Sequence, residues 1–255
     1  MASSSRLALI LVATGALLAG AAVARAAEAA PAGVQTGQHP QTLKTDATEA
    51  GEVRYLLYVP AEYTKTDKKW PLVLFLHGLG ESGEDLEKVK VHGPPKLAAA
   101  GKAFPFLCAS PQCPKGKWWS HPDRLAGLVA LLGHLQKAYR VDPDRVYLTG
   151  LSMGGFGTWA LATKEPKRFA AIAPICGRGD PEKAARIAHI PAWVFHGGKD
   201  GVVQPRHSED MVKALKAAGG HPKFTIYPDA GHDSWTKTYA NPEFWKWLLA
   251  QKRKK

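Results

Sequence analysis

One serine lies between two glycines at the point where a short apolar run is followed by a helix-compatible segment. The run Val-Tyr-Leu at 146–148 favours a strand, and Gly150-Leu151-Ser152-Met153-Gly154 comes directly after it. In this context, Gly-x-Ser-x-Gly is typical of a tight strand-turn-helix bend that holds the serine in a strained conformation. Glycines are needed on both sides because a Cβ would clash there. We therefore predict that Ser152 is a nucleophile.

A serine hydroxyl is a poor nucleophile at neutral pH, so it needs a base, and the base needs an orienting acid. Of the ten histidines, His232 is the best candidate because it lies in a turn just beyond the last predicted strand. Asp200 follows the preceding strand, which gives the chain order Ser, Asp, His. Asp180 is a rival acid, because it follows the strand after the serine bend. Asp229 and Asp233 lie too close to the histidine in sequence to orient it.

Two backbone N–H groups are predicted to bind the oxyanion that forms when a serine attacks a carbonyl. Met153 follows the nucleophile, and the geometry of the bend makes its N–H one donor to the oxyanion. Leu79 lies between the glycines of His77-Gly78-Leu79-Gly80, where small neighbours let the backbone approach a substrate. Preorganised donors of this kind are worth about 3 to 4 kcal/mol each.

The apolar patterning predicts an α/β fold with the site at one edge of the sheet. Strand-like runs occupy residues 53–59, 72–76, 104–110, 146–148, 169–176, 192–195 and 224–227, and helical patterns occupy 123–139, 153–163, 205–218 and 241–251. This alternation predicts a single-domain, mostly parallel central sheet with helices on both faces. Ligand sites in such sheets lie at the carboxyl ends of the strands. Only residues 177–191 separate two late strands, so we expect a minimal cap or none.

The N-terminal segment has the composition of an export signal. Arg6 precedes an apolar stretch from Leu7 to Val23, and Ala24-Arg25-Ala26 offers small residues at cleavage spacing. The short apolar stretch favours a cleaved signal peptide over 1–26 rather than a membrane anchor, which predicts a secreted or periplasmic protein. Residues 27–44 lack periodicity and are interpreted as a flexible leader, and 45–255 as one catalytic domain.

The formal net charge of +12 is spread over the chain and indicates a solvated basic surface. Because there is no nucleic-acid motif, no nucleic-acid partner is expected. Cys108, Cys113 and Cys176 fit no metal-ligand spacing, so no metal is expected. Export permits one disulfide, and Cys113 and Cys176 could meet because each follows a predicted strand. Free buried cysteines fit the sequence equally well.

Six short motifs together resemble the α/β-hydrolase superfamily, and within it compact secreted carboxylesterases of the dienelactone hydrolase, feruloyl esterase and polyhydroxybutyrate-depolymerase-like kind. They are His77-Gly-Leu-Gly80, Ser110-Pro-Gln-Cys-Pro114, Gly150-Leu-Ser-Met-Gly-Gly155, Pro174-Ile-Cys-Gly177, His196-Gly-Gly-Lys-Asp200 and Gly231-His232. The resemblance implies ester hydrolysis through an acyl-enzyme, with Ser152, Asp200 and His232 as the catalytic residues. It implies Leu79 and Met153 as oxyanion donors, and neither a metal nor an organic cofactor.

Two other classes of protein are alternatives to a carboxylesterase of this fold. The catalytic domain of prolyl oligopeptidases is a similar match, but we expect no room here for the large gating domain that precedes it in that family. A non-catalytic binding protein of the same fold is the second alternative, against which the ordered serine, acid and histidine argue.

An open site favours small or polymer-linked carboxylic esters, such as feruloyl or acetyl esters. The predicted substrate contacts are Trp235, Gln112, Trp118 and Trp119.

Overall fold

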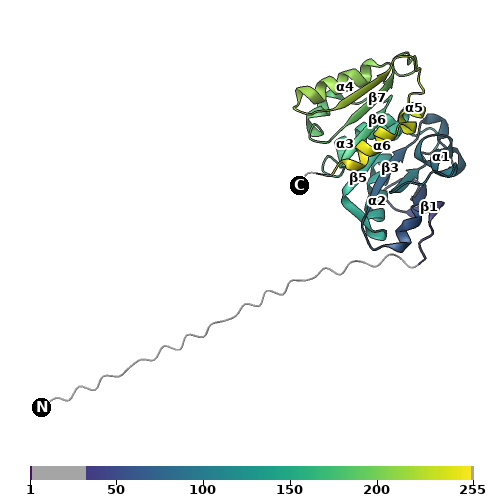
Figure 1. Ribbon diagram of the computed structural model, residues 1–255, viewed down its shortest axis with the longest axis vertical. Coiled ribbons are helices and arrows are strands. Elements are labelled where there is room, and N and C mark those ends of the chain that lie inside the picture. The colour runs from purple at the N-terminus through teal and green to yellow at the C-terminus, as the bar shows by residue number, and fades with distance from the viewer. Residues whose placement is uncertain (2–32, 254–255) are drawn as a thin grey trace.

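The core of the computed structural model, which describes residue 1 and residues 33–253, is an eight-stranded sheet. The strands are β1 (Gly37–Lys44), β2 (Glu52–Val59), β3 (Trp70–Leu76), β4 (Leu107–Pro111), β5 (Val141–Leu151), β6 (Ala171–Ile175), β7 (Trp193–Gly197) and β8 (Lys223–Tyr227). Their order is β1-β2-β4-β3-β5-β6-β7-β8, with β1 at one end and β7 near the other in Figure 1. The pairs β1–β2 and β2–β4 are antiparallel, and all other pairs are parallel. The predicted mostly parallel sheet is confirmed.

Helices cover both faces of the sheet, as predicted. They are α1 (Gly93–Ala99), α2 (Pro122–Ala138), α3 (Met153–Lys164), α4 (Arg206–Ala217), α5 (Trp235–Ala240) and α6 (Pro242–Ala250). Every residue of β3 is buried, with Leu72 and Leu74 packed among α2, α3 and α4, and Val73 and Phe75 packed among α5 and α6. Alternating side chains of one strand therefore enter two cores, which explains the uninterrupted apolar run in its sequence.

The flexible leader predicted for residues 27–44 is wrong for its last eight residues. Gly37–Lys44 forms β1, which pairs along its whole length with β2, from Gly37 opposite Val59 to Lys44 opposite Glu52. None of the residues of this edge strand is buried, and it contains Pro40, which suits an edge strand because proline has no N–H to donate to a neighbouring strand. Leu43 is the one large apolar side chain of this strand and packs against the core, so the sequence carries no alternating apolar pattern. The predicted signal peptide and residues 27–32 lie outside the described residues.

The connection between β6 and β7 contains one short 3₁₀ helix, η4 (Pro181–Arg186), and no larger insertion. The expectation of a minimal cap is therefore confirmed. Three further 3₁₀ helices, η1 (Ala61–Lys65), η2 (Leu79–Glu81) and η3 (Leu86–Val91), lie between β2 and β4, and the sequence patterns predicted none of them. Between residues 33 and 253, none of the helices is long and apolar enough to cross a membrane.

Candidate active site

Ser152 occupies the turn between β5 and α3 in a conformation that few non-glycine residues adopt. Its φ is 52° and its ψ is −118°, and strain of this kind costs on the order of 1–3 kcal/mol. Two backbone hydrogen bonds hold the turn: the N–H of Ser152 donates to the carbonyl of Ile175 at 3.0 Å, and the N–H of Phe156 donates to the carbonyl of Ser152 at 3.0 Å. The strained bend predicted from the sequence is present, and it presents the hydroxyl at the carboxyl end of the sheet.

The glycines around Ser152 let neighbouring backbone segments approach the turn closely. A Cβ at Gly154 would lie 1.9 Å from the carbonyl oxygen of Leu76, and a Cβ at Gly150 would lie 2.4 Å from the carbonyl oxygen of Gly154. Real Cβ atoms do not approach other atoms this closely, and the obstructing atoms are backbone that cannot move aside. These contacts explain why glycines are required on both sides of Ser152.

A hydrogen-bonded series joins Ser152, His232 and Asp200, which come from three separate segments. The Ser152 Oγ lies 2.9 Å from His232 Nε2, and His232 Nδ1 lies 2.8 Å from Asp200 Oδ2. Because an ionised carboxylate only accepts hydrogen bonds, Nδ1 carries the proton and Nε2 accepts from the serine hydroxyl. The imidazole therefore has the tautomer that a base acting on Ser152 requires.

The loop after β7 fixes the Asp200 carboxylate. Its Oδ1 accepts hydrogen bonds from the backbone N–H groups of Val202 and Val203, each at 2.9 Å. Burial by itself raises the pKa of Asp200, but the hydrogen bonds from His232 and from these two backbone groups outweigh burial. The pKa of Asp200 therefore lies below its ordinary value, and the group is a carboxylate at neutral pH.

A second histidine, His196, is fully buried and contacts the Asp200 carboxylate. Its Nε2 lies 2.8 Å from the carbonyl oxygen of Val203 and 3.2 Å from Asp200 Oδ2, and both of these atoms are acceptors. Nε2 therefore carries the proton, and Nδ1 accepts from the Ser208 hydroxyl at 2.7 Å. His196 therefore stabilises the loop that carries Asp200.

Asp180, the rival acid, is not part of this series. It is exposed, its carboxylate caps η4 by accepting from the N–H of Glu182 at 3.1 Å, and it forms an ion pair with Lys183 at 2.8 Å. The hydrogen bond from Lys183 lowers the pKa of Asp180. The structure thus joins His232 to Asp200 and gives Asp180 a separate role at a helix terminus.

The two predicted oxyanion donors are the first residues of their helices. Leu79 begins η2 and Met153 begins α3, so neither N–H has an acceptor within its own helix. Both residues line the cleft that contains Ser152. The α3 N-terminus also carries a partial positive charge that favours an anion at this place.

His77 holds the turn that presents Leu79. Its Nε2 accepts from the N–H of Cys113 at 3.0 Å, so its Nδ1 carries the proton and donates to the carbonyl of Gly78 at 2.5 Å. Burial lowers the pKa of His77 to about 4, so the ring is neutral at physiological pH. The carbonyl of His77 accepts from the indole N–H of Trp119 at 3.0 Å. His77 is therefore a structural support for the turn.

A cleft of about 440 Å³ opens over Ser152. Trp235 and Trp118, two of the predicted substrate contacts, lie in its wall, and the Trp235 ring packs edge to face against His232 with centroids 5.2 Å apart. The lining residues are Gly78, Leu79, Gly80, Glu81, His92, Trp118, Leu151, Ser152, Met153, Phe156, Val202, Val203, His232 and Trp235.

The other two predicted substrate contacts are corrected by the structure, because neither lines the cleft. Gln112 is buried, and its side-chain N–H groups donate to the carbonyls of Glu81 at 3.0 Å and Asp85 at 2.6 Å. Trp119 is also buried and packs against His77 with ring centroids 5.1 Å apart. Both residues support the segment that carries Leu79 instead of facing the opening.

Glu81 and His92 also line the cleft, and neither was predicted from the sequence as a site residue. Glu81 ends η2 and is buried, and its Oε1 lies 3.8 Å from His92 Nε2. The His92 ring packs edge to face against Trp235 at 5.3 Å, so these two residues connect the turn of Leu79 to the ring beside His232. The only signal in the sequence was the position of Glu81 directly after His77-Gly-Leu-Gly80.

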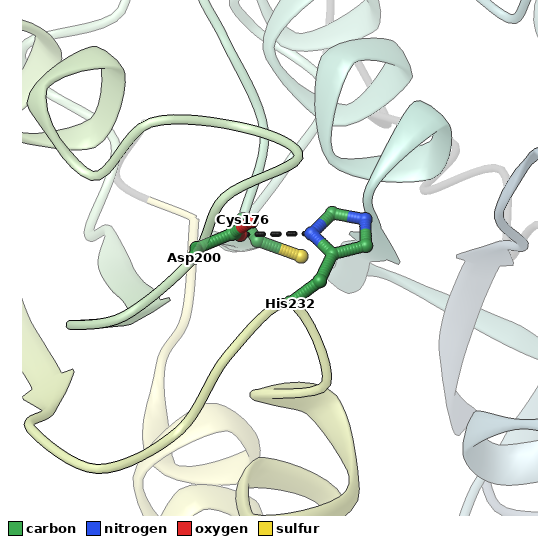
Figure 2. A group of neighbouring side chains, drawn as sticks. All are labelled: Cys176, Asp200 and His232. Carbon is green, nitrogen blue, oxygen red and sulfur yellow. Dashed lines mark hydrogen bonds and ion pairs between the residues drawn. The ribbon is translucent and has the colours of Figure 1, made fainter.

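Cys176 lies next to Asp200 and His232, and the three potential ligand atoms are within 4.8 Å of one another (Figure 2). Cys176 is fully buried, and burial raises the pKa of its thiol to about 12, whereas a metal-binding cysteine must be a thiolate. Asp200 and His232 are also in direct contact at 2.8 Å, closer than two ligands separated by bonds of about 2 Å to one ion. The arrangement therefore suits a hydrogen bond between the Asp200 carboxylate and the His232 imidazole, and not the binding of one metal ion by all three residues.

The three cysteines of the described region are all free and buried. The suggested pairing of Cys113 with Cys176 is therefore wrong. Cys113 packs near the His77 turn, where its Sγ lies 3.4 Å from the carbonyl oxygen of Lys117, whereas Cys176 lies behind Ser152 after β6. Cys113 follows the carboxyl end of β4 and Cys176 that of β6, but β3 and β5 lie between these two strands in the sheet.

The mostly parallel eight-stranded sheet, with a strained serine between β5 and α3, defines the α/β-hydrolase fold. Residues 111–243 match the sequence profile of the dienelactone hydrolase family. Because this match covers more than half of its residues, the chain belongs to that family.

Three similar proteins have esterase or depolymerase names. The protein named "Putative esterase NocK" from Nocardia uniformis subsp. tsuyamanensis is 31% identical over 62% of this chain and 48% of its own length. Poly(3-hydroxybutyrate) depolymerase from Ralstonia pickettii is 29% identical over 64% of this chain and 37% of its own length. The solved structure of a thermostable esterase is 36% identical, with a TM-score of 0.74 over 85% of this chain and 63% of that chain. The chain thus spans about half or less of these two curated relatives.

Proposed function

We propose that this protein is a serine hydrolase of carboxylic esters in which Ser152 is the nucleophile, His232 the general base and Asp200 the orienting acid. The observation that carries the proposal is the continuous series from Ser152 Oγ to His232 at 2.9 Å and from His232 to Asp200 at 2.8 Å. The family, and the esterase and depolymerase names of the similar proteins, support the choice of an ester substrate.

In the first half of the reaction, His232 Nε2 takes the hydroxyl proton while Ser152 Oγ forms a bond to the ester carbonyl carbon. The carbonyl electron pair moves to oxygen, and the N–H groups of Leu79 and Met153 donate to this oxyanion. Each such donor stabilises the transition state by about 3 to 4 kcal/mol. Collapse of the intermediate breaks the bond to the leaving oxygen, which receives its proton from His232. An alcohol departs and an acyl-enzyme remains.

The second half repeats the same chemistry with water. His232 Nε2 takes a proton from a water molecule as its oxygen attacks the acyl carbon, and the same two N–H groups bind the new oxyanion. The bond to Ser152 Oγ then breaks, and His232 returns the proton to the serine. Throughout, Asp200 stays ionised and stabilises the imidazolium, in keeping with its lowered pKa.

We further propose that the substrates are esters attached to extracellular polymers, or short-chain esters, encountered after export through residues 1–26. Two features support an open site: the connection between β6 and β7 holds only η4, and the cleft wall contains three aromatic rings, Trp118, Phe156 and Trp235. Aromatic rings pack well on planar acyl groups and on the flat faces of sugars. A site without a cap does not shelter a long lipid chain from water.

The test is a kcat/KM series over p-nitrophenyl esters of increasing acyl length, methyl ferulate, and a proline-containing peptide amide. We expect short and aromatic acyl groups to be preferred, amide cleavage to be negligible, and Ser152→Ala to lower kcat by about a millionfold. A steady rise toward long acyl chains would refute the open-site argument. Efficient amide cleavage would identify a peptidase, and an absence of any ester cleavage would identify a non-catalytic binding protein.

A further inference from the structure

A second cavity of about 860 Å³ lies beside the cleft, and none of the three catalytic residues lines it. Its floor is one face of α3, because Trp159, Ala160 and Thr163 lie three, four and seven residues after Phe156, a spacing that places all four on the same side of a helix. Phe156 also lines the cleft over Ser152, so the two cavities adjoin at this ring. We call the second cavity the α3 groove.

The α3 groove lies between two walls that differ in chemistry. One wall is the start of α2 and the residues just before it, with Ser120, Pro122 and Leu125 lining the groove. The other wall consists of the residues after β6 and the 3₁₀ helix η4, from Arg178 to Arg186. Larger insertions at this connection would cover α3, but here the segment is short, so Phe156, Ala160 and Thr163 remain partly exposed.

The rim of the α3 groove is strongly cationic. Four basic side chains line it, namely Lys164, Arg178, Lys183 and Arg186, together with a single carboxylate, Asp180. Asp180 is paired with Lys183 at 2.8 Å. Within residues 33–253, no carboxylate lies within ion-pair distance of the other three basic side chains. The groove therefore combines an apolar aromatic floor with three cations that have no partner in this region.

The cations are distributed along the groove rather than gathered at one point. Arg178 follows Gly177, whose backbone touches Gly155 in the first turn of α3, so Arg178 lies at the end nearest the cleft. Lys164 is the last residue of α3, roughly 12 Å further along the helix from Phe156. A ligand with a single anionic headgroup would engage only one end. Charges repeated along an extended chain would engage both.

From this arrangement we propose that the α3 groove binds a segment of an acidic polysaccharide, a chain of uronate sugars, whose attached ester enters the cleft at Phe156. Sugar rings offer flat C–H faces that pack on the aromatic floor, and guanidinium groups bind carboxylates through paired hydrogen bonds. The inference rests on the proposed esterase function only for the ester that the chain carries. Binding of the sugar chain itself does not depend on catalysis.

The first test measures binding alone. Isothermal titration of the full chain with unesterified oligogalacturonate is compared with a neutral xylo-oligosaccharide of equal length, at low and high salt. We expect the acidic chain to bind, its affinity to fall as salt rises, and the neutral chain to bind much more weakly. Equal affinity for the two chains, or affinity for oleate or anionic lipid vesicles in place of the oligogalacturonate, would overturn the proposal.

A matched pair of variants assigns the binding to the α3 groove. Arg178→Ala combined with Arg186→Ala should weaken oligogalacturonate binding roughly tenfold, because each exposed ion pair contributes a factor of up to about five. Lys213→Ala combined with Lys216→Ala removes the same charge from two exposed residues of α4 that do not line the groove, and should change binding less than twofold. Equal weakening by both pairs would show that binding reflects net charge only, and would overturn the assignment.

The kinetic test separates this proposal from the proposed function. With O-acetylated polygalacturonate as substrate, the paired arginine variant should lose kcat/KM by roughly the same tenfold, whereas kcat/KM for p-nitrophenyl acetate should be unchanged. Binding of oligogalacturonate without cleavage of either ester would refute the esterase function and leave the groove intact. Cleavage of p-nitrophenyl acetate with no effect of the arginines on the acidic polymer would refute the groove and leave the esterase function intact.

Discussion

Replacing Asp200 with asparagine should disable the protein through the tautomer of His232. The Oδ1 position accepts from two backbone N–H groups, those of Val202 and Val203, which cannot become acceptors. The amide oxygen of Asp200→Asn must therefore occupy that position, and its NH₂ group must face His232. An NH₂ group donates, so His232 Nδ1 becomes an acceptor and the imidazole proton moves to Nε2. Nε2 then donates to Ser152 and cannot take its proton.

The expected loss of kcat for Asp200→Asn is about 10⁴, or about 5.4 kcal/mol of transition-state stabilisation, with little change in KM. The assay is p-nitrophenyl acetate hydrolysis by wild type and variant, with thermal unfolding to show that both are folded. Asp180→Asn is the matched control, because its carboxylate is exposed and paired with Lys183, and it should retain nearly full activity. A loss below about tenfold in Asp200→Asn, or a larger loss in Asp180→Asn, would refute the reasoning.

Three further predictions concern stability and covalent state. Burial lowers the pKa of His77 from 6.5 to about 4, so the unfolded chain binds more protons than the folded protein between these pH values. The free energy of unfolding should therefore fall by about 3 kcal/mol as the pH drops from 6.5 to 4. Urea unfolding at a series of pH values should show that the free energy of unfolding of His77→Gln depends less steeply on pH. Gly154→Ala should abolish activity and lower Tm, because its Cβ would meet the carbonyl of Leu76. Gly133→Ala in α2 is the control: its Cβ meets no atom, so it should be neutral or stabilise the protein by up to about 1 kcal/mol. Similar Tm changes in the two variants would count against the steric argument. Alkylation of the denatured, unreduced protein should modify all three cysteines, and a mass showing fewer adducts would reveal a disulfide that the structure lacks.

The sequence was sufficient where a short-range steric rule or the chain order of strands determines position. The glycines around Ser152 identify the bend because no other residue fits so close to β3. Asp200 and His232 follow separate strands, and the carboxyl ends of parallel strands meet at one edge, so their proximity could be predicted without a structure. These two rules are independent of how individual side chains pack.

The sequence was insufficient where packing decides which way a side chain points. Trp118 and Trp119 are neighbours of the same type, yet the first lines the cleft and the second is buried against His77. Glu81 and His92 lie in different 3₁₀ and loop segments and meet only in the folded protein. The edge strand β1 has only one large apolar side chain, Leu43, so it has no alternating apolar pattern from which it could be predicted.

The most direct test of the central claim is labelling of the folded protein with a fluorophosphonate, followed by peptide mass mapping. Such probes phosphonylate a serine only when a neighbouring base activates its hydroxyl, as His232 does at 2.9 Å. We predict one adduct, on the peptide containing Ser152, which is absent in Ser152→Ala and forms far more slowly in Asp200→Asn. An adduct at any other residue, or none on the folded wild-type protein, would contradict the assignment of Ser152 as the nucleophile.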